Sequence, residues 1–309
     1  MSALQNSVAS KRRKPGMAGI KGACDCHVHL FGPIASYPLD ADSLYTPPDA
    51  LSSQLRDVQW QLGIDRVVVV QPSAYGTDNR RTLSGVEELG ISSTRAVVCV
   101  ADDVTDRELS EMHKWGARGI RMNLVTHGIP GAEDAAARLL RAIELLRGSD
   151  WHIQLYSKPD LLVALGEIIE GSGLPVVLDH FAGLRFGAPD FASHLTNLKL
   201  LLQNSRAYIK LSGVSHLRNG SSLEQVRELT SDLIETAPDR MIWGTDWPHI
   251  DAAKMGLSSR DRILPYEIVD DSELLDLFVR SAADQAALTR ILVENPCDLY
   301  GFDLPRGGK

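Results

Sequence analysis

The sequence predicts an α/β protein built as a closed (β/α)8 barrel of the TIM type, and three observations support this. Eight apolar runs of strand length alternate with amphipathic stretches of helix length. Runs such as RVVVVQ and LPVVLDH are almost continuously apolar, which is typical of a parallel sheet covered on both faces. Eight such units fit a chain of 309 residues, and no GxGxxG or GxxxxGK[ST] motif follows a strand to indicate an open nucleotide-binding sheet.

The strands are predicted from these apolar runs. In chain order they cover residues 22–29, 66–71, 94–101, 119–124, 151–156, 175–180, 207–212 and 241–246. Helices are predicted between them at 103–115, 136–147, 158–170 and 222–236, where apolar residues recur on one face. The long segment 30–53 contains four prolines and is expected to form a structured lid near the mouth of the barrel.

Composition and charge limit the class of protein. With 44% hydrophobic and 23% charged residues, the chain is neither disordered nor fibrous. Residues 1–21 carry five basic residues and no acid, so subtracting these from the formal net charge of -8 leaves -13 on the rest. A net charge this negative on residues 22–309 argues against general nucleic-acid binding, because phosphates are bound by clustered basic residues. We expect a flexible basic tail at 1–20 and a single barrel domain at 21–309, as a monomer or small homo-oligomer.

The four cysteines do not suggest a disulfide framework. Cys24 and Cys26 are separated by one residue, too close for an unstrained bridge, which favours a reducing compartment. No apolar run is long enough for a membrane helix, and no hydrophobic segment follows the basic cluster at 11–14. We therefore expect a cytoplasmic protein without a membrane partner. Because Cys24 and Cys26 alternate with His27 along the strand, they are expected to pack against the barrel.

Polar side chains gather at the predicted carboxyl ends of the strands, which is where barrel enzymes place their chemistry. The motif DCHVH puts His27 and His29 on the same side of the first strand. The other strand ends contribute Arg121 and Asn123 from strand four, Tyr156 from strand five, Asp179 and His180 from strand six, and Asp246 and His249 from strand eight. Because these ends meet around one axis, the sequence predicts one shared site.

These motifs carry a family resemblance. DCHVH and WGTDWPH resemble the amidohydrolase superfamily, so the barrel is expected to be amidohydrolase-like. Together with YTPPDA, VVVQPSAYGTDN, GIRMN, VVLDHFAG and ENPCDLYGF, they look like its 2-pyrone-4,6-dicarboxylate lactonase branch, over about residues 20–302. The resemblance implies a hydrolase that opens a cyclic ester.

The resemblance leaves two versions of the site open. Many superfamily members hold divalent metals, but strand four here offers Arg121, and strand five offers Gln154 and Tyr156, where bridging and histidine ligands are expected. This argues against a binuclear site. A single Zn²⁺ on His27, His29 and Asp246, with His180 nearby, is one version. In the other, which the lactonase branch implies, the same residues work without a metal. No organic cofactor is expected.

Lactone hydrolysis suggests a role for each residue. Asp246 is the expected general base for the attacking water, while His27, His29 and His180 polarise the carbonyl by hydrogen bonds or through a cation. Arg121 offers a planar fork to a substrate carboxylate. The lactonase pattern implies that Tyr45, Ser73 and Tyr156 are polar substrate contacts. His249 is expected at the mouth.

Two positions depart from the lactonase pattern. His127 and His216 stand where that pattern carries arginines for a second carboxylate, which puts the pyrone itself in doubt. A muconolactone, a sulfonated muconolactone or a sugar-acid lactone fits better. Arg185 and Arg218, after strands six and seven, are candidates to replace the lost charge, and the extra histidines are candidates for metal ligands.

The expected function is hydrolysis of a small anionic lactone in the degradation of aromatic compounds. A metal-dependent decarboxylase of an aromatic or muconate-type acid and a sugar-acid lactonase are the enzymatic alternatives. A non-catalytic lactone-binding barrel is the third, since a fold alone does not imply activity. Asp246 together with its histidines argues against that last reading.

Overall fold

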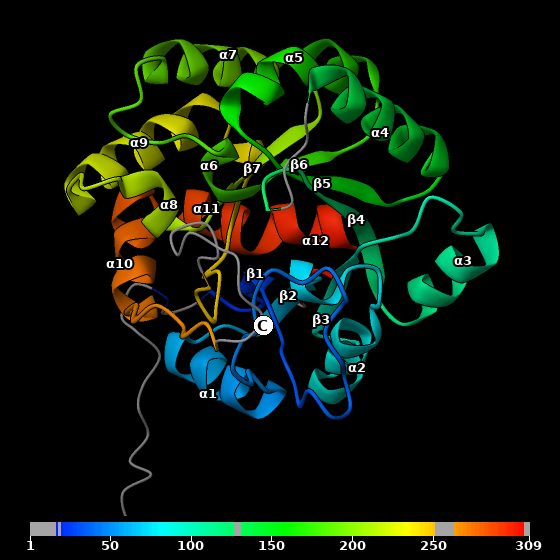
Figure 1. Cartoon of the computed structure of the whole chain (residues 1–309). Coiled ribbons are helices and arrows are strands. Elements are labelled where there is room, and N and C mark those ends of the chain that lie inside the picture. The colour runs from blue at the N-terminus through cyan, green and yellow to red at the C-terminus, as the bar shows by residue number, and fades with distance from the viewer. Residues whose placement is uncertain (1–16, 18–19, 127–130, 251–262, 306–309) are drawn as a thin grey trace, which may run out of the picture.

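The computed structural model describes residues 17, 20–126, 131–250 and 263–305, and its core is a sheet of eight parallel strands (Figure 1). The strands are paired in chain order. They are β1 (Cys24–Val28), β2 (Arg66–Val70), β3 (Thr94–Val98), β4 (Ala117–Asn123), β5 (His152–Tyr156), β6 (Val176–Leu178), β7 (Ala207–Leu211) and β8 (Met241–Trp243). The predicted (β/α)8 barrel is confirmed.

The barrel closes between β8 and β1 through residues that follow β8. The amide of Asp246 donates to the carbonyl of His27 at 2.9 Å, and the amide of His29 donates to that of Trp247 at 2.8 Å. The buried Asp25 carboxylate accepts from the amide and the hydroxyl of Thr245. This seam therefore fixes the backbone of Asp246 directly against the backbone of the two histidines.

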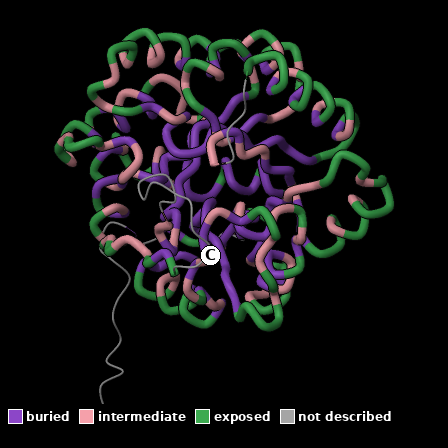
Figure 2. The backbone as a smooth tube through the Cα atoms, viewed as in Figure 1, coloured by how far each residue is buried: buried purple, intermediate pink, exposed green. Residues whose placement is uncertain are grey.

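The helices cover the outside of the strands, so the strands are buried and the outer helix faces are exposed (Figure 2). They are α1 (Ser52–Leu62), α2 (Arg80–Leu89), α3 (Asp106–Lys114), α4 (Ala132–Leu145), α5 (Pro159–Gly171), α6 (Asp179–Ala182), α7 (Phe191–Asn204), α8 (Val214–Arg218), α9 (Leu223–Thr236), α10 (Asp271–Ser281), α11 (Gln285–Thr289) and α12 (Asn295–Tyr300). Short 3-10 turns at Ser73–Tyr75 (η2) and Pro238–Arg240 (η3) and a π-helical turn at Arg290–Glu294 (η5) complete them.

Local sequence explains where several helices begin. Thr105 and Glu108 form a capping box at α3, and Ser222 with Gln225 forms another at α9. Proline occupies the first position of α5, where its missing amide hydrogen is not needed. The predicted helices at 103–115, 136–147, 158–170 and 222–236 correspond to α3, α4, α5 and α9, displaced by up to four residues at their ends.

The C-terminal helices close the amino end of the barrel. Arg66, at the start of β2, donates to the sulfur of Cys297 in α12. At the start of β3, Arg95 donates to the carbonyl of Tyr300. The ring of Tyr300 packs edge-on against the ring of His152 in β5, with 5.1 Å between the ring centroids. A ligand therefore has to enter from the opposite, carboxyl end.

Strands three, six and eight are shorter than predicted, so their predicted ends at residues 101, 180 and 246 are wrong; β3 ends at Val98. β6 ends at Leu178 and β8 ends at Trp243. Beyond them the chain turns, and His180 (φ 53°) and Asp246 (φ 71°) adopt left-handed backbone conformations that side chains other than glycine rarely occupy. Such strained residues are concentrated at functional sites because the surrounding structure must hold them.

The predicted lid between β1 and α1 packs on a small apolar cluster. Phe31 and Ala50 exchange backbone hydrogen bonds, which closes the loop. A second core separate from the barrel lies beneath it, made of Phe31, Tyr45, Ala50, Ala74, Tyr75 and Leu264. The loop is thus held in place at the mouth of the barrel.

Several other predictions concern single residues. Cys24 and Cys26 are fully buried in the barrel core, as expected for packing residues. Of the residues expected to form the basic tail, Met17 and Ile20 are described, and both are buried. Among the described helices, none has the length and apolar character needed to cross a membrane.

Candidate active site

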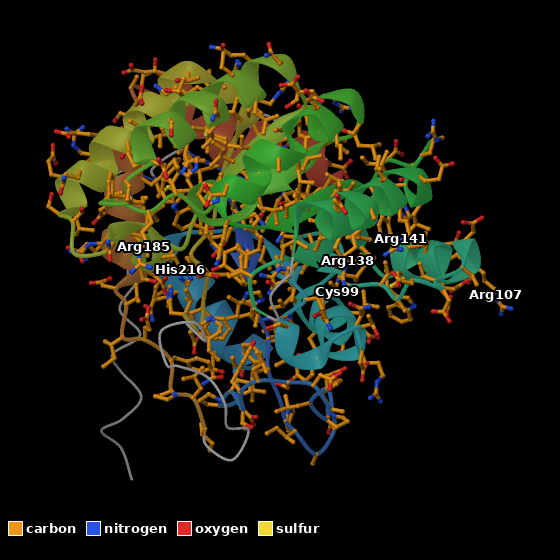
Figure 3. The ribbon with its side chains drawn as sticks, turned by 45° about the horizontal axis from the view of Figure 1, so that its top comes forward. Cys99, Arg107, Arg138, Arg141, Arg185 and His216 are labelled. Carbon is orange, nitrogen blue, oxygen red and sulfur yellow. The ribbon has the colours of Figure 1, made fainter. Side chains whose placement is uncertain are left out.

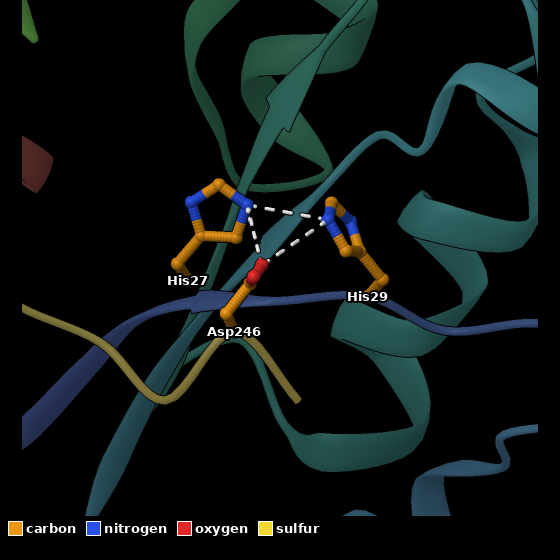
Figure 4. A group of neighbouring side chains, drawn as sticks. All are labelled: His27, His29 and Asp246. Carbon is orange, nitrogen blue, oxygen red and sulfur yellow. Dashed lines mark hydrogen bonds and ion pairs between the residues drawn. The ribbon is translucent and has the colours of Figure 1, made fainter. Parts of the chain in front are cut away.

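The carboxylate of Asp246 lies at the centre of four histidines. Its Oδ1 is 3.6 Å from Nε2 of His27 and 3.9 Å from Nε2 of both His29 and His180. Its Oδ2 is 3.8 Å from Nε2 of His216. Figure 4 shows Asp246 facing His27 and His29, which project from β1 and the residue that follows it. The predicted meeting of strands one, six and eight is therefore present, and His216 in α8 joins them.

The hydrogen bonds of His29 define which of its nitrogens carries a hydrogen. Nδ1 lies 2.8 Å from the carbonyl oxygen of Val70, which can only accept, so Nδ1 is the donor. In the neutral ring, Nε2 then offers a lone pair. That lone pair faces Nε2 of His27 at 3.2 Å.

His180 owes its position to the turn after β6. Its Nδ1 lies 3.0 Å from the hydroxyl oxygen of Ser212. Its ring is perpendicular to the ring of Tyr156, and the two ring centroids are 5.1 Å apart. Gly213 makes this possible, since a Cβ there would lie 2.5 Å from Nδ1 of His180. Only glycine fits beside this ring.

Burial shifts the pKa of Asp246 and the pKa values of the neighbouring histidines in opposite directions. Burial raises the pKa of Asp246 to about 6, although His216 and His249 oppose the shift. Burial also lowers the pKa of His29 to about 3 and the pKa values of His27 and His180 well below the usual range. Near neutral pH the site therefore combines an ionised carboxylate with three neutral rings.

A buried lysine lies beneath the histidines, and the sequence reasoning missed it. Nζ of Lys210 in β7 is 2.8 Å from Oε1 of Gln154, 3.2 Å from Nδ1 of His27 and 3.1 Å from Oδ1 of Asp179. Gln154 in turn donates to Oδ2 of Asp179 at 2.9 Å. A lysine inside the apolar run AYIKL was the available signal, because lysine is almost never fully buried without a partner.

The charge of Asp179 is held by this network. Burial alone would raise the pKa of Asp179, but Lys210 and His27 outweigh it and hold the pKa well below the usual range. The sequence placed Asp179 at a strand end without giving it a role. It also passed over His152 on β5, which lies at the opposite end of the barrel against Tyr300.

Arg121 is anchored with part of its guanidinium turned to the site. Its Nη1 donates to the carbonyl of Gln71 at 3.0 Å, and its Nε lies 3.7 Å from Oδ2 of Asp179. Nε is nevertheless buried without a hydrogen-bond partner in the described part of the chain. A buried guanidinium fixed on one side is suited to bind an anion with its remaining donors.

An inner cavity of about 300 Å³ brings most of the predicted site residues together. It is lined by His29, Leu44, Tyr45, Pro72, Ser73, Arg121, Asn123, Val125, Thr126, Tyr156, His180, His216, Asp246 and Ile250. The hydroxyls of Tyr45 and Ser73 lie 3.2 Å apart on its wall. Among these described residues Arg121 is the only arginine or lysine. His27 is fully buried behind this wall.

A larger outer cavity of about 1440 Å³ adjoins the inner one through Tyr156, His180 and His216. His249 lines this outer cavity, where its Nε2 pairs with Asp271 at 2.8 Å. Arg185 and Arg218 line it too. Arg185 and His216 lie on the same side of the barrel, opposite Arg107, Arg138 and Arg141 (Figure 3). His127 lies outside the described residues.

The side chains fit a single divalent cation in donor type and spacing. His27, His29 and Asp246 form one possible ligand group, and His27, Asp179 and His180 form another. The lone pair on Nε2 of His29 is of the kind that ligates a metal, but it faces Nε2 of His27 at 3.2 Å. His27 is less suited, because its Nδ1 faces the hydrogen donor Lys210.

Known proteins resemble this chain over most of its length. The amidohydrolase family model matches residues 24–302. A 4-sulfomuconolactone hydrolase of Rhizobium radiobacter is 33% identical over 287 residues, covering 91% of this chain and 90% of that protein. A 2-pyrone-4,6-dicarboxylate hydrolase of Comamonas testosteroni is 29% identical and covers 93% and 92%.

A solved structure also resembles this chain in fold. A structure from Agrobacterium tumefaciens superposes with a TM-score of 0.75 at 26% identity, covering 92% of this chain and 97% of that one. The resemblance predicted from the motifs is confirmed over nearly the whole sequence. The chain is a member of the amidohydrolase family.

Proposed function

We propose that this protein hydrolyses the cyclic ester of a small anionic lactone, of the muconolactone or sulfomuconolactone type, in the degradation of aromatic compounds. The observation that carries the proposal is the Asp246 carboxylate, encircled by four histidines beside a cavity that Arg121 lines. The relatives named as 4-sulfomuconolactone and 2-pyrone-4,6-dicarboxylate hydrolases support the same reaction class.

The reaction begins with Asp246 as general base. Its carboxylate accepts a proton from a water molecule, and the resulting hydroxide adds to the lactone carbonyl carbon. The bond between that carbon and the ring oxygen then breaks, and protonated Asp246 returns the proton to the departing oxygen. One water is consumed, and the product is an open-chain acid with a free hydroxyl or enol.

The histidines and Arg121 stabilise developing charge and orient the substrate. His180 lines the cavity, and when its Nδ1 accepts from the hydroxyl of Ser212, its Nε2 hydrogen can stabilise the negative charge that develops on the carbonyl oxygen. A divalent ion held by His27, His29 and Asp246 would, when bound, polarise that carbonyl as a Lewis acid. Arg121 orients the ring through a charged substituent, and the hydroxyls of Tyr45 and Ser73 offer polar contacts on the same wall.

The substrate class follows from the charge of the inner cavity. Only Arg121 carries a permanent positive charge among its described residues, and His216 replaces the second arginine expected for a dicarboxylate. A lactone with one charged group close to the ring and any second one on a flexible arm, as in muconolactone and its sulfonated form, therefore suits this cavity better than a flat dicarboxylate.

A panel of anionic lactones tests the proposal. Purified protein is mixed with muconolactone, sulfomuconolactone, pyrone dicarboxylate and sugar-acid lactones, and ring opening is followed by acid release with a pH indicator. We expect turnover of muconolactone or sulfomuconolactone. Carbon dioxide release without ring opening would favour the decarboxylase instead, and no change in any lactone would favour a binding protein. Activity before and after chelation shows whether a cation takes part.

A further inference from the structure

The hydrogen bonds around His27 form a continuous series, and only one direction of donation along this series satisfies every donor and acceptor. It starts at Lys210 in β7, passes through His27 and His29, and ends at the carbonyl of Val70 in β2. The end of the series sets the direction, since the carbonyl of Val70 only accepts. Nδ1 of His29 must therefore hold the hydrogen, and Nε2 of His29 must accept from His27.

The start of the series agrees with this direction. Lys210 has only hydrogens to offer, and three acceptor atoms surround its Nζ: Oε1 of Gln154 at 2.8 Å, Oδ1 of Asp179 at 3.1 Å and Nδ1 of His27 at 3.2 Å. Hydrogen bonds join Nζ to Oε1 of Gln154 and to Nδ1 of His27, while Oδ1 of Asp179 forms an ion pair with the ammonium group without hydrogen-bond geometry. All of these groups are fully buried, so water does not compete.

We infer that Lys210 is a positioning residue for the candidate active site, which holds His27 in the tautomer with hydrogen on Nε2. His27 then presents a donor, not a lone pair, to His29 and to Asp246, whose Oδ1 lies 3.6 Å away. In the proposed lactonase this hydrogen bond fixes the ring of His29 beside the Asp246 carboxylate. The same tautomer removes one lone pair from the possible cation ligands, so that Lys210 also weakens divalent metal binding.

An alternative arrangement is built into the same residues. Oδ1 of Asp179 lies 3.4 Å from Nδ1 of His27 and could accept a hydrogen from it. Without the lysine, His27 is free to carry its hydrogen on Nδ1 and donate it to Asp179 once a cation takes the lone pairs that Nε2 of His27 and Nε2 of His29 then both present. A carboxylate behind a histidine is the arrangement commonly found at metal ligands. Lys210 thus selects between a hydrogen-bonding and a metal-binding form of His27.

The test compares wild-type protein with Lys210→Met by ¹⁵N NMR of labelled histidine rings, whose shifts distinguish the two tautomers. The His27 signals are identified by their loss in His27→Gln. We expect hydrogen on Nε2 in the metal-free wild type and on Nδ1 in zinc-loaded Lys210→Met. Zinc chloride titrated into chelator-treated protein should bind at least tenfold more tightly to the variant. Gln154→Met, which leaves the contact between Lys210 and His27, should keep the wild-type tautomer.

Removing Lys210 leaves Asp179 buried without its cation, so the single variant could fail to fold. The double variant Lys210→Met/Asp179→Asn keeps the charge balanced and retains an oxygen that can accept from Nδ1. Hydrogen on Nδ1 of His27 in the wild type, or an unchanged zinc affinity in the folded variant, would overturn the inference. Because the spectra need no turnover, failure of the proposed lactonase reaction would leave this result unaffected.

Discussion

Oδ1 of Asp246 lies 3.6 Å from Nε2 of His27, and the backbones of the same two residues are joined by a hydrogen bond of 2.9 Å. The first residue follows β8 and the second lies in β1. Both the backbone and the side chains of the base and its neighbour are thus set by the closure of the barrel. A backbone hydrogen bond from the turn at Asp246 to a barrel strand favours a site with fixed geometry.

The first prediction concerns the general base. Asp246→Asn keeps the size of the side chain but removes the proton acceptor, so kcat for lactone opening should fall by at least about 10²-fold. Steady-state kinetics with the best lactone from the panel measures this. Asp232→Asn, which changes an acid of α9 that pairs with Lys199, is the matched control and should keep normal turnover. Near wild-type kcat in Asp246→Asn would exclude the mechanism.

The second prediction concerns pH. The carboxylate is the active form of Asp246, and burial raises its pKa to about 6, so protonation below that value should inactivate the enzyme. At pH 5 kcat/KM should be about one tenth of its value at pH 7 to 8. Burial keeps the pKa values of His27, His29 and His180 lowered, so these rings stay neutral over this range and should not contribute the acid limb.

A pH profile of kcat/KM, corrected for spontaneous hydrolysis, checks this. The Asp232→Asn control should show the same profile as the wild type. A constant kcat/KM between pH 5 and 8 would contradict the assignment of Asp246 as the base.

The third prediction concerns substrate charge. Arg121→Met should raise KM for anionic lactones by about 10- to 100-fold, the range expected for losing a hydrogen bond between charged groups. Uncharged lactones should be affected much less. Arg147→Met is a suitable control because Arg147 follows α4, pairs with Glu144 at the surface and is 72% exposed. Equal effects on charged and uncharged lactones would argue against an anion site at Arg121.

The accuracy of the sequence predictions differs between the fold and the site for physical reasons. Apolar runs and the rule that barrel chemistry lies at carboxyl strand ends were enough to bring His29, Arg121, His180 and Asp246 to one cavity. The actual ends of β6 and β8 were missed because apolar patterning does not report the left-handed turns at His180 and Asp246. A pattern records burial, not backbone conformation.

Lys210 illustrates a second limit. Its partners Gln154, Asp179 and His27 come from three other regions of the chain, and only the closed barrel brings them around one ammonium group. The sequence alone showed a charge within an apolar strand without showing what neutralises it. Interactions across the barrel interior depend on register between strands, which no local pattern specifies.

The fourth prediction concerns the seam that holds the site. Gly244 lies between β8 and Asp246, and a Cβ at this position would come within 2.8 Å of both the amide nitrogen and the Cβ of His27. The obstructing atoms belong to the backbone and to its first side-chain carbon, so they cannot rotate away. Gly244→Ala should therefore push β8 from β1, costing about 1–3 kcal/mol of folding free energy as overpacking does. Because the same shift moves Asp246 relative to His27, kcat should fall as well.

Thermal unfolding and steady-state kinetics measure the two effects on the same preparation. Gly166→Ala is the matched control, because Gly166 lies within α5 and an added Cβ there meets nothing within 4 Å. Alanine in a helix interior is favoured over glycine by roughly 0.5–1 kcal/mol, so this variant should be as stable as the wild type or more so, with unchanged kcat. If Gly244→Ala matched this control in both stability and turnover, the close approach of β8 to His27 would not be what positions the base.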